Sequence, residues 1–161
     1  SNNSALLSNN LSPKVTKYSS PQDKINLFSS LFKGREDVYA LRWYNSKTGK
    51  SGYSPVCLNK WMSGVCNMSK VKCVDCNYRS YAPLNDKAIY AHLCGKDELC
   101  RDVIGIYPML ADETTNVLVL DFDDGEWQED VATVREICNE NNIPCYTERS
   151  RSGSGAHLLL N

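Results

Sequence analysis

The first apolar pattern along the chain is that of a helix. Apolar residues recur at intervals of three to four between Ser20, whose hydroxyl suits an N-cap, and Gly34, which suits a stop. Pro21 fits the first turn, and Asp23 favours the positive end of the helix dipole. One helix is therefore expected between Ser20 and Gly34. Its apolar stripe consists of Ile25, Phe28, Leu31 and Phe32.

A strand and a tight turn are expected next. Val38 to Tyr44 is rich in β-favouring residues, and Lys47 to Gly52 has the composition of a turn. Gly49-Lys50-Ser51 within that turn is similar to the end of a phosphate-binding loop. That motif needs a glycine where the chain has Tyr44, and a helix where it continues with Gly52 and Pro55. An exposed hairpin turn is the favoured interpretation.

The rest of the chain alternates between helix and strand patterns. Asn85 suits the cap of a short helix that stops at Gly95. Val117 to Leu120 is a continuous apolar run, typical of a strand buried on both faces. Further on, the spacing predicts a helix over 127–139, a strand over 145–148, a Gly/Ser-rich turn over 150–155 and a strand over 156–160. The fold class is therefore mixed α/β (α+β).

Length and composition limit the class of protein. The chain has 161 residues, of which 42% are hydrophobic, which suits one domain or one domain with a small appendage. Residues 1–20 are rich in Ser and Asn, and we expect a flexible leader before a main unit over 21–161. No apolar run of about 18 residues and no secretory signal occur. We therefore expect a cytoplasmic protein without a membrane partner.

The charges are unevenly distributed. Residues 1–101 carry 15 Lys/Arg against 7 Asp/Glu, whereas residues 102–161 carry 3 against 12. A basic half suits a polyanion and an acidic half suits cations, which together suggest nucleic acid and a divalent metal. On composition alone, solvated surfaces of both signs are the favoured explanation, and both interpretations stay open.

Four of the eight cysteines form a cluster with metal-ligand spacing. Cys57, Cys66, Cys73 and Cys76 are separated by eight, six and two residues. A Cys-x-x-Cys turn presents two sulfurs on one side, and an earlier pair can complete a tetrahedral zinc site. We expect a structural Zn²⁺ in a region over 53–82. The alternative is four buried or redox-active thiols.

The other cysteines and His92 have no comparable spacing. We expect Cys94, Cys100, Cys138 and Cys145 to act as small apolar side chains, and His92 to be a satisfied structural histidine. Around the four-cysteine cluster, basic and aromatic residues alternate, a pattern that can pair with phosphates and stack on bases. A solvated rim over a small aromatic core is the other interpretation. These residues are Lys60, Trp61, Lys70, Lys72, Tyr78, Arg79 and Tyr81.

Two carboxylates follow the apolar run. Side chains alternate along a strand, so Asp121 and Asp123 are expected on one face. Neighbouring carboxylates repel unless protonated or bridged by a cation, and hard oxygen ligands suit Mg²⁺ or Mn²⁺. Asp124 is a weaker candidate in the following turn. The pattern by itself also fits an ordinary acidic turn after a strand.

The Gly/Ser-rich turn offers groups that bind phosphate. It supplies cations, hydroxyls and flexible backbone N–H groups immediately before a histidine, which suits a triphosphate. An ordinary hairpin turn with a half-buried His157 is the alternative. Adjacent strands would place the acids and His157 on the same sheet face. The candidate nucleotide-binding residues are Arg149, Arg151, Ser154, Gly155 and His157.

These motifs resemble those of archaeo-eukaryotic primases (primase-polymerases), especially the branch found in TOTE conflict systems of bacteria and mobile elements. The resemblance runs from about residue 22 to the end of the chain. It is carried by Leu120-Asp121-Phe122-Asp123, the run 148–157, the cysteine cluster, His92-Leu93-x-Gly95-Lys96 and Tyr107-Pro108.

The resemblance implies roles for the candidate residues. Asp121 and Asp123 match the family motif that holds divalent ions, and His157 matches the histidine that contacts nucleotide phosphates. The family's third carboxylate has no counterpart in this sequence. The resemblance also implies a partial RRM-like β-α-β-β unit over 115–161, so we expect an N-terminal part of a longer protein.

The expected function is template-directed, metal-dependent nucleotidyl transfer by that longer protein, in DNA replication, with weak or no activity of this part alone. Its partners would be a nucleic-acid template and nucleoside triphosphates, with a possible helicase or nuclease. One alternative is a non-catalytic zinc-containing nucleic-acid-binding module, and another is a structural zinc domain for protein contacts. The choice between DNA and RNA and the oligomeric state stay open.

Overall fold

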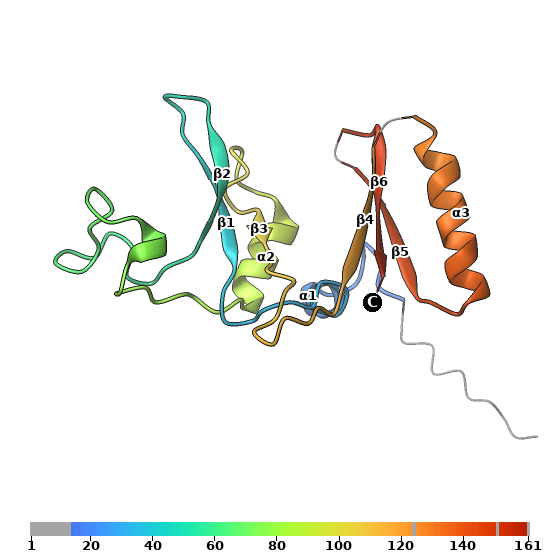
Figure 1. Cartoon of the computed structure of the whole chain (residues 1–161), viewed down its shortest axis with the longest axis horizontal. Coiled ribbons are helices and arrows are strands. Elements are labelled where there is room, and N and C mark those ends of the chain that lie inside the picture. Colours follow the sequence, from blue (N-terminus) through green and yellow to red (C-terminus); the bar gives the residue numbers. More distant parts are fainter. Residues whose placement is uncertain (1–13, 124, 151, 161) are drawn as a thin grey trace, which may run out of the picture.

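The computed structural model describes residues 14–123, 125–150 and 152–160. Within them the chain is a mixed α/β structure with three α-helices and two antiparallel three-stranded sheets. Figure 1 shows the two sheets side by side, with no strand in common. No helix in the described part of the chain is long and apolar enough to cross a bilayer.

The first sheet has the order β2-β1-β3, formed by β1 (Ala40–Tyr44), β2 (Ser51–Pro55) and β3 (Ile104–Gly105). Helices α1 (Pro21–Leu31) and α2 (Asp86–Cys94) pack against each other. The core beside this sheet joins one isoleucine from each helix with one from β3, because their apolar side chains leave water together. These are Ile25, Ile89 and Ile104.

The N-caps of both helices follow the predictions, whereas the predicted stop at Gly34 does not. Ser20 and Asp23 form a capping box at the start of α1, and the Asn85 side chain accepts a hydrogen bond from the backbone of Ala88 at the start of α2. Gly95 ends α2 in the left-handed conformation. Helix α1 ends at Leu31, before Gly34. Gly34 instead lies so close to the backbone of Tyr107 that a Cβ would not fit.

The predicted hairpin turn is confirmed. Tyr44 of β1 pairs with Ser51 of β2, and the backbone N–H of Asn45 donates to the carbonyl of Lys50 over 2.8 Å. Gly49 has a φ of 68°, which favours glycine in this turn. Since a strand follows instead of a helix, the similarity to a phosphate-binding loop does not extend to structure.

The second sheet has the order β4-β6-β5, formed by β4 (Leu118–Asp123), β5 (Cys145–Arg149) and β6 (Gly155–Leu160). Helix α3 (Trp127–Glu140) connects β4 to β5 and packs on β6 and β4. The predicted succession of strand, helix, strand and strand is therefore observed.

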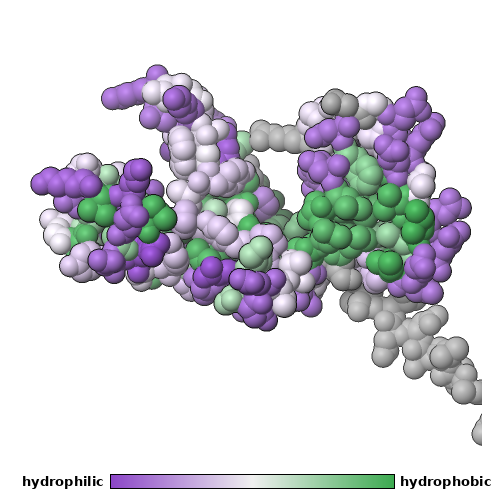
Figure 2. Space-filling model, in the orientation of Figure 1, coloured by the Kyte–Doolittle hydropathy of each residue, from purple (hydrophilic) through white to green (hydrophobic). Residues whose placement is uncertain are grey.

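The prediction that Val117 to Leu120 forms a strand buried on both faces is wrong. Leu118 and Val119 are 53% and 50% exposed, because β4 lies at an edge of the sheet. The central strand β6 takes the buried position instead, with consecutive residues Leu158 and Leu159 both buried. Figure 2 shows the resulting apolar surface over the second sheet.

The segment between β2 and α2 contains little regular structure. Its one helical turn is η1 (Cys73–Asp75), and its two ends are held together by an antiparallel bridge between Cys57 and Tyr81. It extends away from the first sheet in Figure 1. The four clustered cysteines lie in this segment, and sulfur positions there depend on loops and not on a sheet.

Candidate functional site

Three polar side chains form a row across the second sheet. In β6, His157 is paired with Asp121 of β4 on one side and with Glu148 of β5 on the other. Residues directly opposite each other in antiparallel strands point to the same face. The expected shared face for the acids and the histidine is thus observed.

The imidazole contacts a carboxylate at each ring nitrogen. The Nδ1 atom lies 2.8 Å from Glu148 Oε1, and the Nε2 atom lies 3.4 Å from Asp121 Oδ1. The first contact is a hydrogen bond, with Nδ1–H donating to the carboxylate. All three side chains remain accessible to solvent, so a ligand can reach them.

The pKa of His157 is raised above its ordinary value. The main cause is the hydrogen bond to Glu148; partial burial opposes the rise, and the negative charges of Asp121, Glu148 and Asp123 add to it. The charged imidazolium is favoured because it can donate from both nitrogens at once. The row therefore places an imidazole whose charged form is favoured between two carboxylates.

Glu148 is absent from the residues that the sequence predicts for the site. The period of two along β5 puts Glu148 and Tyr146 on one face, but only the pairing of β5 with β6 brings Glu148 opposite His157. A register prediction for the strand pair 145–148 and 156–160 could have found it.

A close approach between β4 and β6 leaves room for Asp123. Gly155 is paired with Asp123 and is buried. A Cβ at Gly155 would lie 2.7 Å from Asp123 Oδ1 and would also meet the carbonyl of Phe122. Glycine at this position therefore lets the second carboxylate stand beside the strand end that holds Asp121.

The turn between β5 and β6 is organised by its own polar groups. The Ser152 and Ser154 hydroxyls are 2.8 Å apart, and the backbone N–H of Gly153 donates to the carbonyl of Ser150 over 2.9 Å. The Arg149 guanidinium donates to the carbonyl of Gly153 through Nη2 over 2.8 Å. Ser154 and Gly155 thus lie at the same end of the sheet as Asp123.

Arg149 does not join the row. It is paired with Ala156, so its side chain leaves β5 on the opposite face from Glu148, and its guanidinium is occupied by the turn. Arg151 and Asp124 lie outside the described residues. Of the predicted acid–histidine site, the structure brings together Asp121, Asp123, Gly155 and His157.

The four clustered cysteines line one cavity of about 670 Å³ beside the end of β2. Cys73 is the first residue of η1 and Cys76 directly follows it, with the Cys76 N–H directed to the Cys73 carbonyl. None of the four is in a disulfide. As the loops stand, no three His, Cys, Asp or Glu side chains among the described residues lie close enough to hold a metal ion, in this cavity or in the acid–histidine row.

His92 is structural but not satisfied, contrary to the prediction. It lies on α2 with its ring edge against Phe28, 5.4 Å between centroids. Its Nδ1 atom is buried without a hydrogen-bond partner in the described part of the chain. Burial lowers the pKa of His92, and the charge of Asp102 only partly opposes this.

Two of the remaining cysteines meet in the second sheet. Cys138, on α3, is buried, and its thiol is within hydrogen-bonding reach of Cys145. Burial and this neighbour raise the pKa of the Cys138 thiol, which keeps it protonated and apolar in character. Its behaviour matches that of a small core side chain.

The fold and the row together define a mixed α/β domain with an acidic, imidazole-containing face. A family model described as the archaeo-eukaryotic primase domain of TOTE conflict systems matches residues 23–160. The chain therefore belongs to this primase family. Neither a curated protein nor a solved structure matches it significantly.

Proposed function

We propose that this chain provides the nucleotide-binding part of a primase-polymerase that catalyses template-directed nucleotidyl transfer. Membership of the primase family supports a nucleotidyltransferase type of function. The observation that carries the finer proposal is the register that places His157 between Asp121 and Glu148, beside Asp123. We also propose that β4, α3, β5 and β6 correspond to the first part of the family's RRM-like unit.

Asp121 and Asp123 are the proposed ligands of catalytic Mg²⁺ or Mn²⁺. Their carboxylates are exposed on one face, and hard oxygen donors fit these ions. When bound, the ions would lower the pKa of the attacking hydroxyl and neutralise the triphosphate. The donor set fits, although two carboxylates alone leave several coordination positions for water and for phosphate oxygens.

His157 is the proposed contact to the phosphates. Glu148 holds the Nδ1 proton, which leaves the Nε2–H on the side of Asp121 as the donor for a phosphate oxygen. A positive imidazolium attracts the triphosphate, while Glu148 fixes the ring orientation. Ser154 and the backbone N–H of Gly155 are further proposed donors, and Arg149 would have to leave the Gly153 carbonyl to take part.

Cys57, Cys66, Cys73 and Cys76 are the proposed ligands of a structural Zn²⁺. The Cys-x-x-Cys pair at η1 and the position of all four thiols around one cavity fit this ion. Zinc binding would require the loops to rearrange so that the four sulfurs come together. Bound zinc would supply the order that this segment lacks as secondary structure.

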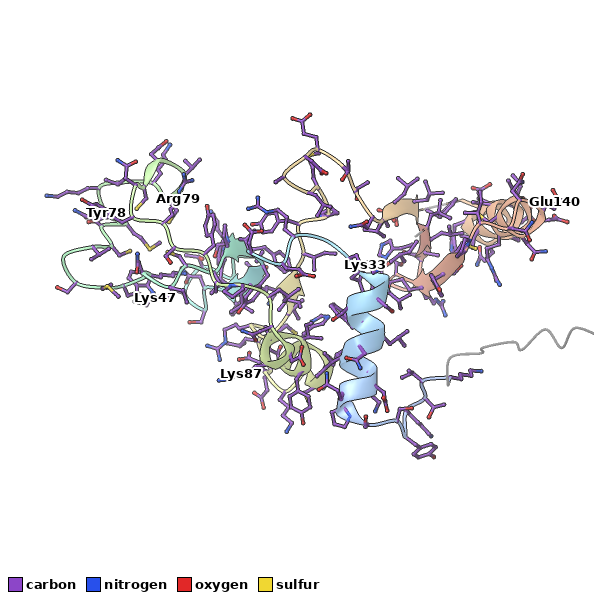
Figure 3. The ribbon with its side chains drawn as sticks, turned by 90° about the horizontal axis from the view of Figure 1, so that it is seen from below. Lys33, Lys47, Tyr78, Arg79, Lys87 and Glu140 are labelled. Atoms are coloured by element: carbon purple, nitrogen blue, oxygen red, sulfur yellow. The ribbon has the colours of Figure 1, made fainter. Side chains whose placement is uncertain are left out.

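Manganese-dependent nucleotide binding tests the proposed site. We expect Asp121→Asn and His157→Ala each to weaken binding of a fluorescent nucleoside triphosphate at least tenfold in Mn²⁺, by isothermal titration or anisotropy. Glu140→Gln, at the last residue of α3 (labelled in Figure 3), is the control and should bind normally. Equal binding by all three variants would contradict the proposal.

A second candidate function is a non-catalytic zinc-containing nucleic-acid-binding module. It is favoured by the excess of basic residues in the segment 57–81, which holds four cations and one carboxylate. Nucleic-acid binding that is indifferent to Asp121→Asn and accompanied by no nucleotide binding would support it. A zinc domain for protein contacts would show neither kind of binding.

A further inference from the structure

Two pairs of adjacent residues, one pair on each of two segments, combine an exposed ring with a cation. Trp61 is 75% exposed and follows Lys60, whereas Tyr78 is 65% exposed and precedes Arg79. Lys60, Tyr78 and Arg79 also line the cavity of the four cysteines. We call these four residues the aromatic platform. They lie in the segment between β2 and α2, which Figure 1 shows beside the first sheet and away from the second sheet.

The two segments are fixed side by side. The backbone N–H of Leu58 donates to the carbonyl of Ser80 over 2.7 Å, and the Asn59 side chain donates to the carbonyl of Tyr78, also over 2.7 Å. The bridge between Cys57 and Tyr81 continues this pairing. The backbone segments that carry the two ring–cation pairs are therefore held together, although 16 residues lie between Trp61 and Tyr78 in the sequence.

The conformation of Trp61 is not explained by packing. Its φ of 65° is unfavourable for a bulky side chain, and the ring remains mostly in solvent. The Lys60 ammonium lies 5.7 Å from the ring centroid, the range of a cation–π contact. An unfavourable backbone that presents a large apolar ring to water contributes little to folding, which points to a ligand.

The charge around the platform selects the ligand. The range 57–81 contains four cationic side chains and a single carboxylate, that of Asp75. The cations are Lys60, Lys70, Lys72 and Arg79. Cations suit phosphates, and exposed rings suit bases that are not already stacked in a duplex. We propose that the aromatic platform binds single-stranded nucleic acid, with bases stacked on Trp61 and Tyr78 and phosphates paired with Lys60 and Arg79.

Oligonucleotide binding by the full chain, purified with Zn²⁺, tests the proposal. We expect labelled oligo(dT) of about 12 nucleotides to bind at low salt, and Trp61→Ala and Tyr78→Ala each to weaken it by about 5- to 150-fold, the range expected for loss of one stacked base. Tyr18→Ala is the matched control, because Tyr18 is 85% exposed with Lys17 over its ring but lies outside the platform.

The salt dependence of oligonucleotide binding tests the two cations of the platform, Lys60 and Arg79. Lys60→Gln combined with Arg79→Gln should reduce the slope of log affinity against log salt by about 1.4, since each phosphate contact to a single strand contributes about 0.7. Lys17→Gln should leave the slope unchanged. Circular dichroism of every variant checks folding, which exposed substitutions should not alter.

Three outcomes would overturn the proposal: no oligonucleotide binding by the zinc-loaded wild type, preference for duplex, or equal losses in Trp61→Ala and Tyr18→Ala. The test is independent of the nucleotide site. Asp121→Asn should lose nucleotide binding but keep oligonucleotide binding. Normal nucleotide binding without oligonucleotide binding would end this inference and leave the proposed nucleotidyltransferase site intact.

Discussion

The properties of single residues in this chain depend on their neighbours across strands and helices. His157 and His92 are the two histidines of the sequence, and their pKa values are displaced in opposite directions. A carboxylate within hydrogen-bonding distance favours the charged ring of His157, whereas burial against Phe28 favours the neutral ring of His92. Their residue types alone could not reveal this difference.

We expect Glu148→Gln to lower the pKa of His157 in the metal-free protein, because the amide removes both the charge and the strongest acceptor. The raised pKa means that the His157 interactions stabilise the fold below the unfolded value of about 6.5, and that this contribution is lost as pH rises through the folded pKa. An NMR titration of the two histidines measures both values. The control variant Glu140→Gln should leave both pKa values unchanged. An unchanged pKa of His157 in Glu148→Gln would show that its hydrogen bond to Glu148 does not raise that pKa.

His92 should make the protein sensitive to acid. Because its folded pKa is lowered, the full contribution to stability is present above about pH 6.5 and is lost as pH falls towards the folded pKa. We expect the urea midpoint of wild type to fall between pH 7 and pH 5 by more than that of His92→Leu, which cannot be protonated. An equal fall of the urea midpoint in the two proteins between pH 7 and pH 5 would contradict this expectation.

Individual elements were more predictable than their burial. The cap residues Ser20 and Asn85 identify two helices, because capping is a local property of the chain. The apolar run before Asp121 identifies a strand correctly but not its edge position, since strand order depends on distant pairing. Glu148 is missed for the same reason. Loop geometry around the cysteines is not encoded in any periodic pattern.

The contact between β4 and β6 should depend on Gly155. We expect Gly155→Ala to destabilise the protein by about 1–3 kcal/mol, because the added methyl group overlaps the Phe122 carbonyl and the Asp123 carboxylate. Urea denaturation measures the loss. Ser154→Ala, the exposed neighbour, is the control. Equal stability of both variants would show that β4 moves aside without cost.

The segment of the four cysteines should bind one metal ion. Elemental analysis should find about one zinc per chain, as expected for a four-thiolate site. Cys73→Ser should reduce the zinc content and affinity, whereas Cys94→Ser, outside the cavity, should retain both. Unchanged zinc in Cys73→Ser would remove these four residues as the ligands.

At the scale of the whole molecule, the change from a basic to an acidic excess along the chain lies near the passage from the first sheet to the second. The basic excess lies in residues 1–101, which include the aromatic platform, and the acidic excess lies in residues 102–161, which include β3 of the first sheet and all strands of the second sheet. A mixed α/β class and the strand positions of Asp121, Asp123 and His157 are accessible from the sequence because they depend on local patterns. The arrangement of two separate sheets is not, because β3 joins the first sheet only through a long-range pairing with β1.

The two sheets share no strand, and this affects how the sequences of related chains can diverge. Backbone hydrogen bonds within each sheet are closed among its own strands, so insertions in the loops beside β2 need not shift the register that aligns Asp121 with His157. Loop exchange between relatives could therefore alter the proposed nucleic-acid contacts while the proposed nucleotide site on the other sheet is kept.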